Sequence, residues 1–163
     1  MLLSAISKDS FSQTYASSIV PCVRDNAVAG EIRLDDGATL GCQSIRNPKQ
    51  KGIVVLLGGH SESYVKYAEL FYDLRDLGIT FYALDLRGQG FSTRMLPDRE
   101  KDFIPAHDRY LVDLKAFMKS VVRPRPDEKV LPFLGAYHEV LLESDSIRDP
   151  ALAAIRNFVQ RNF

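Results

Sequence analysis

Polar and apolar residues alternate in two short stretches of the first third of the chain. Residues 31–34 read Glu-Ile-Arg-Leu, and residues 39–45 read Thr-Leu-Gly-Cys-Gln-Ser-Ile. Because Asp-Asp-Gly at 35–37 is a typical turn sequence, the pattern predicts a β-hairpin. Residues 1–29 show no sustained period, and we expect an irregular arm or a short helix there.

Two apolar runs further along predict strands that are buried on both faces, as in a parallel sheet. They cover Ile53–Leu57 and Ile79–Leu84. Between them, residues 64–77 place apolar side chains at helical spacing, with Ser63 as a candidate N-cap and Gly78 as a C-terminal stop. A strand, a helix and a strand in this order predict a right-handed parallel crossover and an α/β fold.

The remaining chain predicts a loop, two helices and one weak strand. Residues 87–105 carry glycines and charges and predict the loop, and residues 110–121 form an amphipathic helical pattern. Val130–Leu134 is a short candidate strand that contains a proline, which is usually confined to edges or ends. A last helix is expected with Asp149 as its cap and Pro150 in its first turn.

Composition fits one globular domain, which we assign to residues 30–163. Hydrophobic residues make up 45% of the 163 residues, and 21 basic residues balance 21 acidic ones. This balance gives no reason to expect nucleic acid as a partner. The two cysteines are too few for a disulfide framework, and no apolar run approaches the roughly 20 residues of a membrane span. No signal peptide is evident, so we expect a cytoplasmic protein.

Three segments carry candidate chemistry. Residues 57–64 read Leu-Gly-Gly-His-Ser-Glu-Ser-Tyr, residues 85–92 read Asp-Leu-Arg-Gly-Gln-Gly-Phe-Ser, and residues 135–143 read Gly-Ala-Tyr-His-Glu-Val-Leu-Leu-Glu. Together they resemble the α/β-hydrolase family, specifically its bacterial lysophospholipases and monoacylglycerol lipases, over residues 30–163. The resemblance implies a mostly parallel sheet flanked by helices, and an ester hydrolase for a lysophospholipid or a monoacylglycerol.

The resemblance also implies roles for three residues. Gly59 and His60 correspond to the turn that supplies an oxyanion-hole donor, with Gly58 where the family commonly has a histidine. His138 takes the place of the catalytic histidine, which acts as a general base. Taken alone, the glycine pair could be an ordinary strand-to-helix turn, and a loop histidine is more often plain surface.

The middle segment is interpreted as a structural loop. By the resemblance, Asp85, Arg87, Gly88 and Gly90 tie this loop to the sheet, and Ser92 is not a nucleophile. The competing interpretation is a phosphate-binding loop. It is weak because the third glycine, a phosphate-binding lysine and the acidic ribose partner of nucleotide folds are missing.

One part of the family pattern is missing. The nucleophile elbow, Gly-x-Ser-x-Gly, has no counterpart; the near match at 37–41 has Thr39 at its centre and lies in the hairpin. Between Lys129 and Gly135 the family also expects more strands, a lid and the acidic triad member. Loss of the serine alone lowers turnover roughly a millionfold in a well-studied protease. We therefore predict a truncated hydrolase core with at best trace esterase activity; the alternative is a non-catalytic α/β binding module.

Few further partners are expected. No cofactor is predicted, and no metal site, because His60, His107 and His138 lie on separate predicted loops. Residues 123–126, Arg-Pro-Arg-Pro, allow peripheral contact with anionic lipid. Loss of the central strands should leave an edge strand and an apolar helix face poorly covered, which favours a homo-oligomer.

Overall fold

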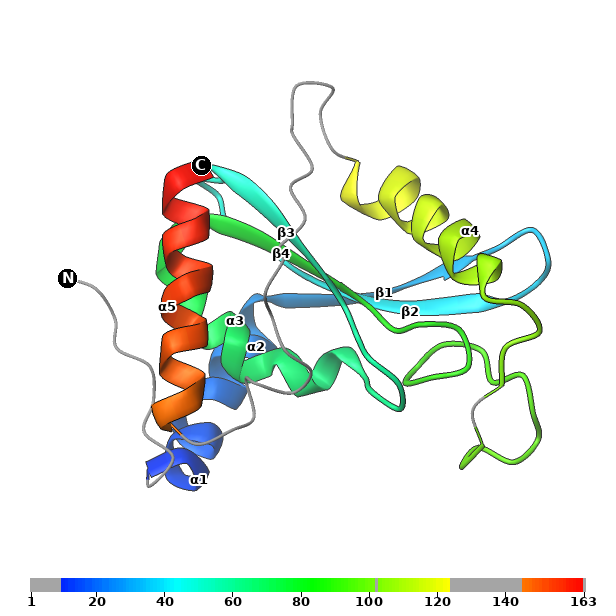
Figure 1. Cartoon of the computed structure of the whole chain (residues 1–163), viewed down its shortest axis with the longest axis horizontal. Helices are drawn as coiled ribbons and strands as arrows, with labels where there is room; N and C mark the ends of the chain where they lie inside the picture. The colour runs from blue at the N-terminus through cyan, green and yellow to red at the C-terminus, as the bar shows by residue number, and fades with distance from the viewer. Residues whose placement is uncertain (1–9, 102, 124–144, 163) are drawn as a thin grey trace.

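The structure is a computed structural model, and it describes residues 10–101, 103–123 and 145–162. Its described strands form one sheet in the order β1-β2-β4-β3 (Figure 1). These strands are β1 (Ala27–Arg33), β2 (Thr39–Ile45), β3 (Gly52–Leu57) and β4 (Ile79–Leu84). The predicted hairpin and both apolar strands are thereby confirmed.

The sheet is mixed. β3 and β4 pair in parallel, as the crossover predicts, whereas β2 pairs antiparallel with both β1 and β4. The sequence predicts a mostly parallel sheet, and the difference arises because the second hairpin strand joins directly onto β4. This pairing makes β4 an inner strand of the described sheet.

Residues 11–26 are helical, which is one of the two forms that the sequence predicts for residues 1–29. α1 (Phe11–Thr14), the π-helical turn η2 (Tyr15–Ile19) and α2 (Val20–Asn26) follow one another, and β1 begins directly afterwards at Ala27. Ile19 is fully buried. These turns are therefore packed onto the molecule.

The crossover helix is confirmed over 64–77, although its ends are 3-10 turns. The order is η3 (Tyr64–Tyr67), α3 (Ala68–Leu74) and η4 (Arg75–Leu77). Gly78 has a φ of 72°, in the left-handed region, and ends the helix as predicted. The chain can therefore turn directly into β4.

The predicted bounds agree with the structure for the first of the two later helices but not for the second. α4 (Asp108–Phe117) continues into the π-helical turn η5 (Met118–Val122), in agreement with the predicted pattern. α5 (Asp145–Asn162) begins four residues before the predicted cap, so Pro150 lies inside the helix. Proline removes one backbone donor there, but buried Leu152 and Val159 anchor the helix against the core.

Helices cover the sheet on two faces (Figure 1). Side chains alternate along β4, so Phe81 and Ala83 pack with α3 and α5, while Tyr82 and Leu84 pack with α4 and η5. β4 is buried along its whole length. β3, by contrast, is only half-buried over Ile53–Leu56, because it is one of the two edge strands of the described sheet. The expected burial on both faces is thus wrong for β3.

No helix in the described segments has both the length and the apolar character that crossing a membrane requires.

Candidate functional site

The loops that follow β3 and β4 lie side by side. Because the two strands are parallel and end in register at Leu57 and Leu84, residues 58–63 and 85–92 leave the same edge of the sheet. Ligand sites of open α/β sheets lie at this carboxyl edge. A pocket of about 320 Å³ opens there. We call it the carboxyl-edge pocket; it is lined by Gly58, Gly59, His60, Leu86, Gln89, Phe103, Ile104, His107 and Tyr110.

A single carboxylate holds the turn after β3. Glu62 Oε2 accepts hydrogen bonds from the Gly59 N–H at 2.8 Å and the Tyr67 hydroxyl at 2.6 Å, and Oε1 accepts one from Lys66. Burial disfavours the charge of Glu62, but these hydrogen bonds outweigh burial and lower its pKa to about 2. Glu62 is therefore a fixed anion at neutral pH, and it closes the turn that carries Gly59 and His60.

Asp85 ties the loop after β4 to the start of the crossover helix. Its Oδ1 accepts the Tyr64 N–H at 2.6 Å, and its Oδ2 accepts the Ser63 hydroxyl at 3.0 Å and the Phe91 N–H at 2.8 Å. Ser63 occupies the N-cap position, but its side chain does not cap the helix as predicted, because it donates to Asp85 instead. Burial raises the pKa of Asp85 against the effect of these hydrogen bonds.

Arg87 joins the same loop to two other elements. Its guanidinium donates to both oxygens of Asp113 on α4, at 3.0 and 2.7 Å, and lies 2.9 Å from Asp36 in the hairpin turn. Arg87 and Asp113 are 4% and 0% exposed. The bonds to Asp113 and Asp36 raise the pKa of Arg87 despite its burial. Sequence reasoning missed Asp113, although a carboxylate on the apolar face of a predicted helix is a usable signal.

The end of the loop is attached to β2. Ser92 Oγ accepts the Gly41 N–H at 3.0 Å and donates to the Asp85 carbonyl at 2.6 Å. Gly90 has a φ of 48°, and a Cβ there would collide with the Asp85 carboxylate. Ser92 is buried with its hydroxyl engaged in both directions, which suits a structural role rather than that of a nucleophile.

Gln89 connects the two loops and was not among the sequence candidates. Its side-chain Oε1 accepts the Glu62 N–H at 3.1 Å, and the residue lines the carboxyl-edge pocket while only 3% exposed. The sequence offered one signal: a glutamine between two glycines in the loop at 85–92. Its partner, 27 positions away, could not be read from that pattern.

The three histidines have two different outcomes. His60 and His107 are both exposed and line the same pocket from two loops, so the fold brings together residues that the sequence separates. His138 lies outside the described residues, as does the candidate strand Val130–Leu134. Within the described part of the chain, no cluster of at least three His, Cys, Asp or Glu side chains could hold a metal ion.

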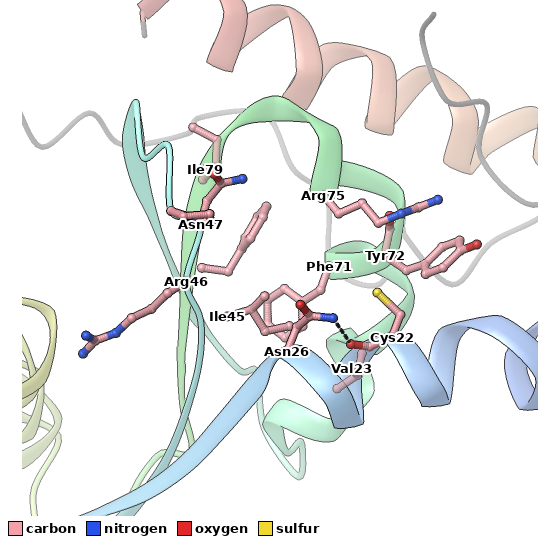
Figure 2. A pocket seen from close by; sticks show the side chains of 12 residues that line it. Cys22, Val23, Asn26, Ile45, Arg46, Asn47, Phe71, Tyr72, Arg75 and Ile79 are labelled. Carbon is pink, nitrogen blue, oxygen red and sulfur yellow. Dashed lines mark hydrogen bonds between the residues drawn. The ribbon is translucent and has the colours of Figure 1, made fainter.

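A second pocket, of about 230 Å³, lies at the opposite end of β4 (Figure 2). Two of its polar side chains are engaged within the protein, and a third points away from the pocket. Asn26 donates to the Cys22 carbonyl at 2.7 Å, the Arg75 guanidinium lies 3.6 Å from the centre of the Tyr72 ring, and Arg46 points away. The carboxyl-edge pocket is therefore the better candidate for a site with polar chemistry.

Known proteins match the chain over part of its length. Lysophospholipase L2 of Escherichia coli K12 is 46% identical over 77 residues, which are 47% of this chain and 23% of that protein. Probable lysophospholipase L2 of Haemophilus influenzae is 30% identical over 69 residues, or 42% of this chain and 21% of that protein. The match thus spans less than a quarter of either relative.

Solved structures also align with part of the chain. Esterase Pf2001 of Pyrococcus furiosus aligns with a TM-score of 0.47 and 22% identity, over 66% of this chain and 42% of the esterase. A mutant haloalkane dehalogenase DatA of Agrobacterium tumefaciens aligns with a TM-score of 0.46 and 20% identity, over 60% and 30% of the two chains.

The family assignment comes from the sequence match to a family model. The model of the serine aminopeptidases S33 matches residues 48–136, which is more than half of the chain. The matched segment includes β3, β4, α4 and both loops of the carboxyl-edge pocket. The chain therefore belongs to the serine aminopeptidase S33 family of α/β-hydrolases, and within that family it resembles the bacterial lysophospholipases.

Proposed function

We propose that the carboxyl-edge pocket binds the ester group of a lysophospholipid or a monoacylglycerol. In this proposal the chain is a lysophospholipase-like ester hydrolase core with at best trace turnover. The observation that carries the proposal is the turn at 58–62, which Glu62 holds against a pocket at the carboxyl ends of two parallel strands. The relatives' name supports the substrate class.

The pocket has the composition that such an ester would need. Leu86, Phe103 and Ile104 give it an apolar wall for an acyl chain, and His60, His107, Tyr110 and Gln89 bring polar groups beside that wall. The lining includes no Asp or Glu, so the ester oxygens would meet no carboxylate there. The Gly59 N–H already donates to the Glu62 carboxylate, so in this arrangement it does not serve developing negative charge, and another donor is needed.

The chemistry remains incomplete without an activated hydroxyl. The sequence has no Gly-x-Ser-x-Gly motif, and Ser92 is committed to Gly41 and Asp85. A histidine such as His138 could then activate water only weakly, because attack and proton transfer normally act as one unit. We therefore expect binding to exceed catalysis.

The experiment is an esterase assay on the purified chain with nitrophenyl butyrate and a fluorophosphonate probe. The proposal expects a trace rate and no labelled serine. If His138→Ala abolishes the trace rate while Cys22→Ser, in the second pocket, preserves it, the rate belongs to a residual hydrolase site. Robust turnover with a labelled serine would contradict the proposal.

The alternative, a non-catalytic binding module, is separated by the same variants. A binding module would bind octanoyl lysophosphatidylcholine or monooctanoylglycerol. Any trace hydrolysis of nitrophenyl butyrate would then be the same in the unmutated chain and in His138→Ala. Comparison of the affinities for the two lipids by isothermal titration also shows which headgroup the chain prefers. Binding of neither lipid would remove the proposed substrate class.

A further inference from the structure

We propose that Gln89 binds the carbonyl oxygen of the ligand's ester through an N–H donor of its Nε2. The inference rests on the proposed function for the class of ligand. It goes further in naming the donor group, which is neither in the oxyanion turn nor among the residues implied by the resemblance.

The orientation of the Gln89 amide follows from its hydrogen bond to the backbone. A backbone N–H can only donate, so the atom 3.1 Å from the Glu62 nitrogen must be the carbonyl oxygen Oε1. Nε2 therefore lies on the other branch of the planar amide. In the described structure no hydrogen bond engages Nε2, and it is not among the fully buried side-chain atoms that lack a partner. Gln89 lines the pocket, and its Nε2 is neither bound to another group nor fully enclosed, so the proposal places its donors at the pocket.

The position of Gln89 is fixed by its surroundings. Its backbone N–H donates to the Leu86 carbonyl at 3.0 Å, and its carbonyl accepts the Ser92 N–H at 2.9 Å. With 3% of its surface exposed, the side chain has already given up most of its hydration and its mobility. Because the side chain is already held in place and largely removed from water, it loses little entropy on binding. A hydrogen bond to an acceptor in the pocket then contributes favourable binding free energy.

The neighbours of Gln89 select the kind of acceptor. The pocket joins this amide to the apolar side chains of Leu86, Phe103 and Ile104. An acyl ester matches this arrangement, because it places a carbonyl oxygen, which only accepts hydrogen bonds, directly at the end of an alkyl chain. An alkyl ether of the same length would keep the chain and lose the carbonyl oxygen.

The test compares octanoyl lysophosphatidylcholine with its octyl ether analogue by isothermal titration. We expect the acyl lipid to bind the unmutated chain about fivefold more tightly, the ratio that one neutral hydrogen bond supplies. Gln89→Glu keeps an oxygen for the Glu62 N–H and removes the donors, so the ratio should fall to about one. Gln89→Met, which also loses the bond to Glu62, should give the same ratio, and Cys22→Ser should keep the original ratio.

Each outcome decides the inference separately from the proposed function. Equal affinities for acyl and ether lipids in the unmutated chain overturn the role of Gln89, even if the chain hydrolyses esters. Binding of neither lipid also overturns it, and the esterase assay then judges the function alone. If circular dichroism shows that a Gln89 variant is unfolded, the acyl-to-ether ratio of the unmutated chain decides the role of Gln89. A ratio that survives folded Gln89→Glu contradicts the inference.

Discussion

The loop at 85–92 and the lining of the carboxyl-edge pocket lie side by side but differ in character. In the loop, Asp85, Arg87 and Ser92 are buried and their polar atoms are bound within the protein. In the pocket, His60 and His107 are exposed on separate loops. The most specific sequence motif therefore builds the buried support of the site, whereas the exposed histidines of the pocket come from other loops. Gln89 belongs to both regions.

The largest expected effect on stability comes from removing the ion pair between Arg87 and Asp113. Arg87→Met would leave Asp113, which is fully buried, as an uncompensated charge. Loss of one partner of a buried pair costs about 3–5 kcal/mol in the free energy of unfolding, to be measured by urea denaturation. Asp36→Asn is the matched control, because Asp36 is 35% exposed and water screens its charge, so its loss should be far smaller than that of Arg87→Met. Equal losses in the two variants would mean that Arg87 does not act through Asp113.

Next in size is the effect of filling the space at Gly90. Gly90→Ala should lower the free energy of unfolding by about 3 kcal/mol, from left-handed strain together with the collision with Asp85. Gly37→Ala provides the comparison, since Gly37 also has a positive φ, of 84°, but nothing lies within 4 Å of its Cβ position. It should lose only about 1 kcal/mol. A Gly90 variant as stable as the Gly37 variant would show that the contact with Asp85 is relaxed easily.

A smaller effect, with a characteristic pH dependence, is expected at Glu62. Glu62→Gln should cost about 2 kcal/mol at neutral pH, because charged hydrogen bonds become neutral ones. The folded-state pKa is about 2, below the ordinary 4.5. The stabilisation from the charge is thus complete above pH 4.5 and is lost as the pH falls toward 2. The stability gap between the unmutated chain and the variant should therefore narrow across this window in denaturation at stepped pH.

Asp35→Asn removes an exposed carboxylate in the hairpin turn; it serves as the control for Glu62 and should leave the free energy of unfolding almost unchanged at neutral pH. A gap for Glu62→Gln that stays constant from pH 2 to 4.5 would contradict the assigned pKa.

The smallest effect belongs to the pocket itself. His107→Ala removes an exposed side chain and should change the free energy of unfolding by less than about 0.5 kcal/mol. Thermal unfolding followed by circular dichroism measures this change. A loss of stability comparable with that of Glu62→Gln would show that His107 supports the fold, as the buried loop residues do. The contrast between the loop and the pocket would then not hold.

Local sequence signals predicted most elements of the fold. The alternation around Asp35-Asp36-Gly37 gave the hairpin, and the apolar runs gave β3 and β4. Gly78 marked the helix end because a left-handed residue is needed there. The predicted start of α5 is wrong. A proline is usually found in the first turn of a helix, but Pro150 lies inside α5, and Leu152 and Val159 stabilise that helix by packing in the core.

The links that organise the site depend on contacts between distant residues, which a single sequence does not encode as a pattern. Arg87 and Asp113 are 26 positions apart, and Glu62 and Gln89 are 27 apart. The roles of His60 in an oxyanion hole and of His138 as a base stay predictions, and so does self-association through a poorly covered edge strand. The half-buried state of β3 is the structural feature on which that last prediction depends.

The most direct test of ligand binding at the carboxyl edge is a proton–nitrogen correlation spectrum of the chain titrated with octanoyl lysophosphatidylcholine. We expect saturable shifts of the Gly59 and His60 amides and of the Gln89 side-chain amide, with residues 22–26 of the second pocket unchanged. Shifts confined to the second pocket, or no saturable shift at the carboxyl edge, would contradict binding there.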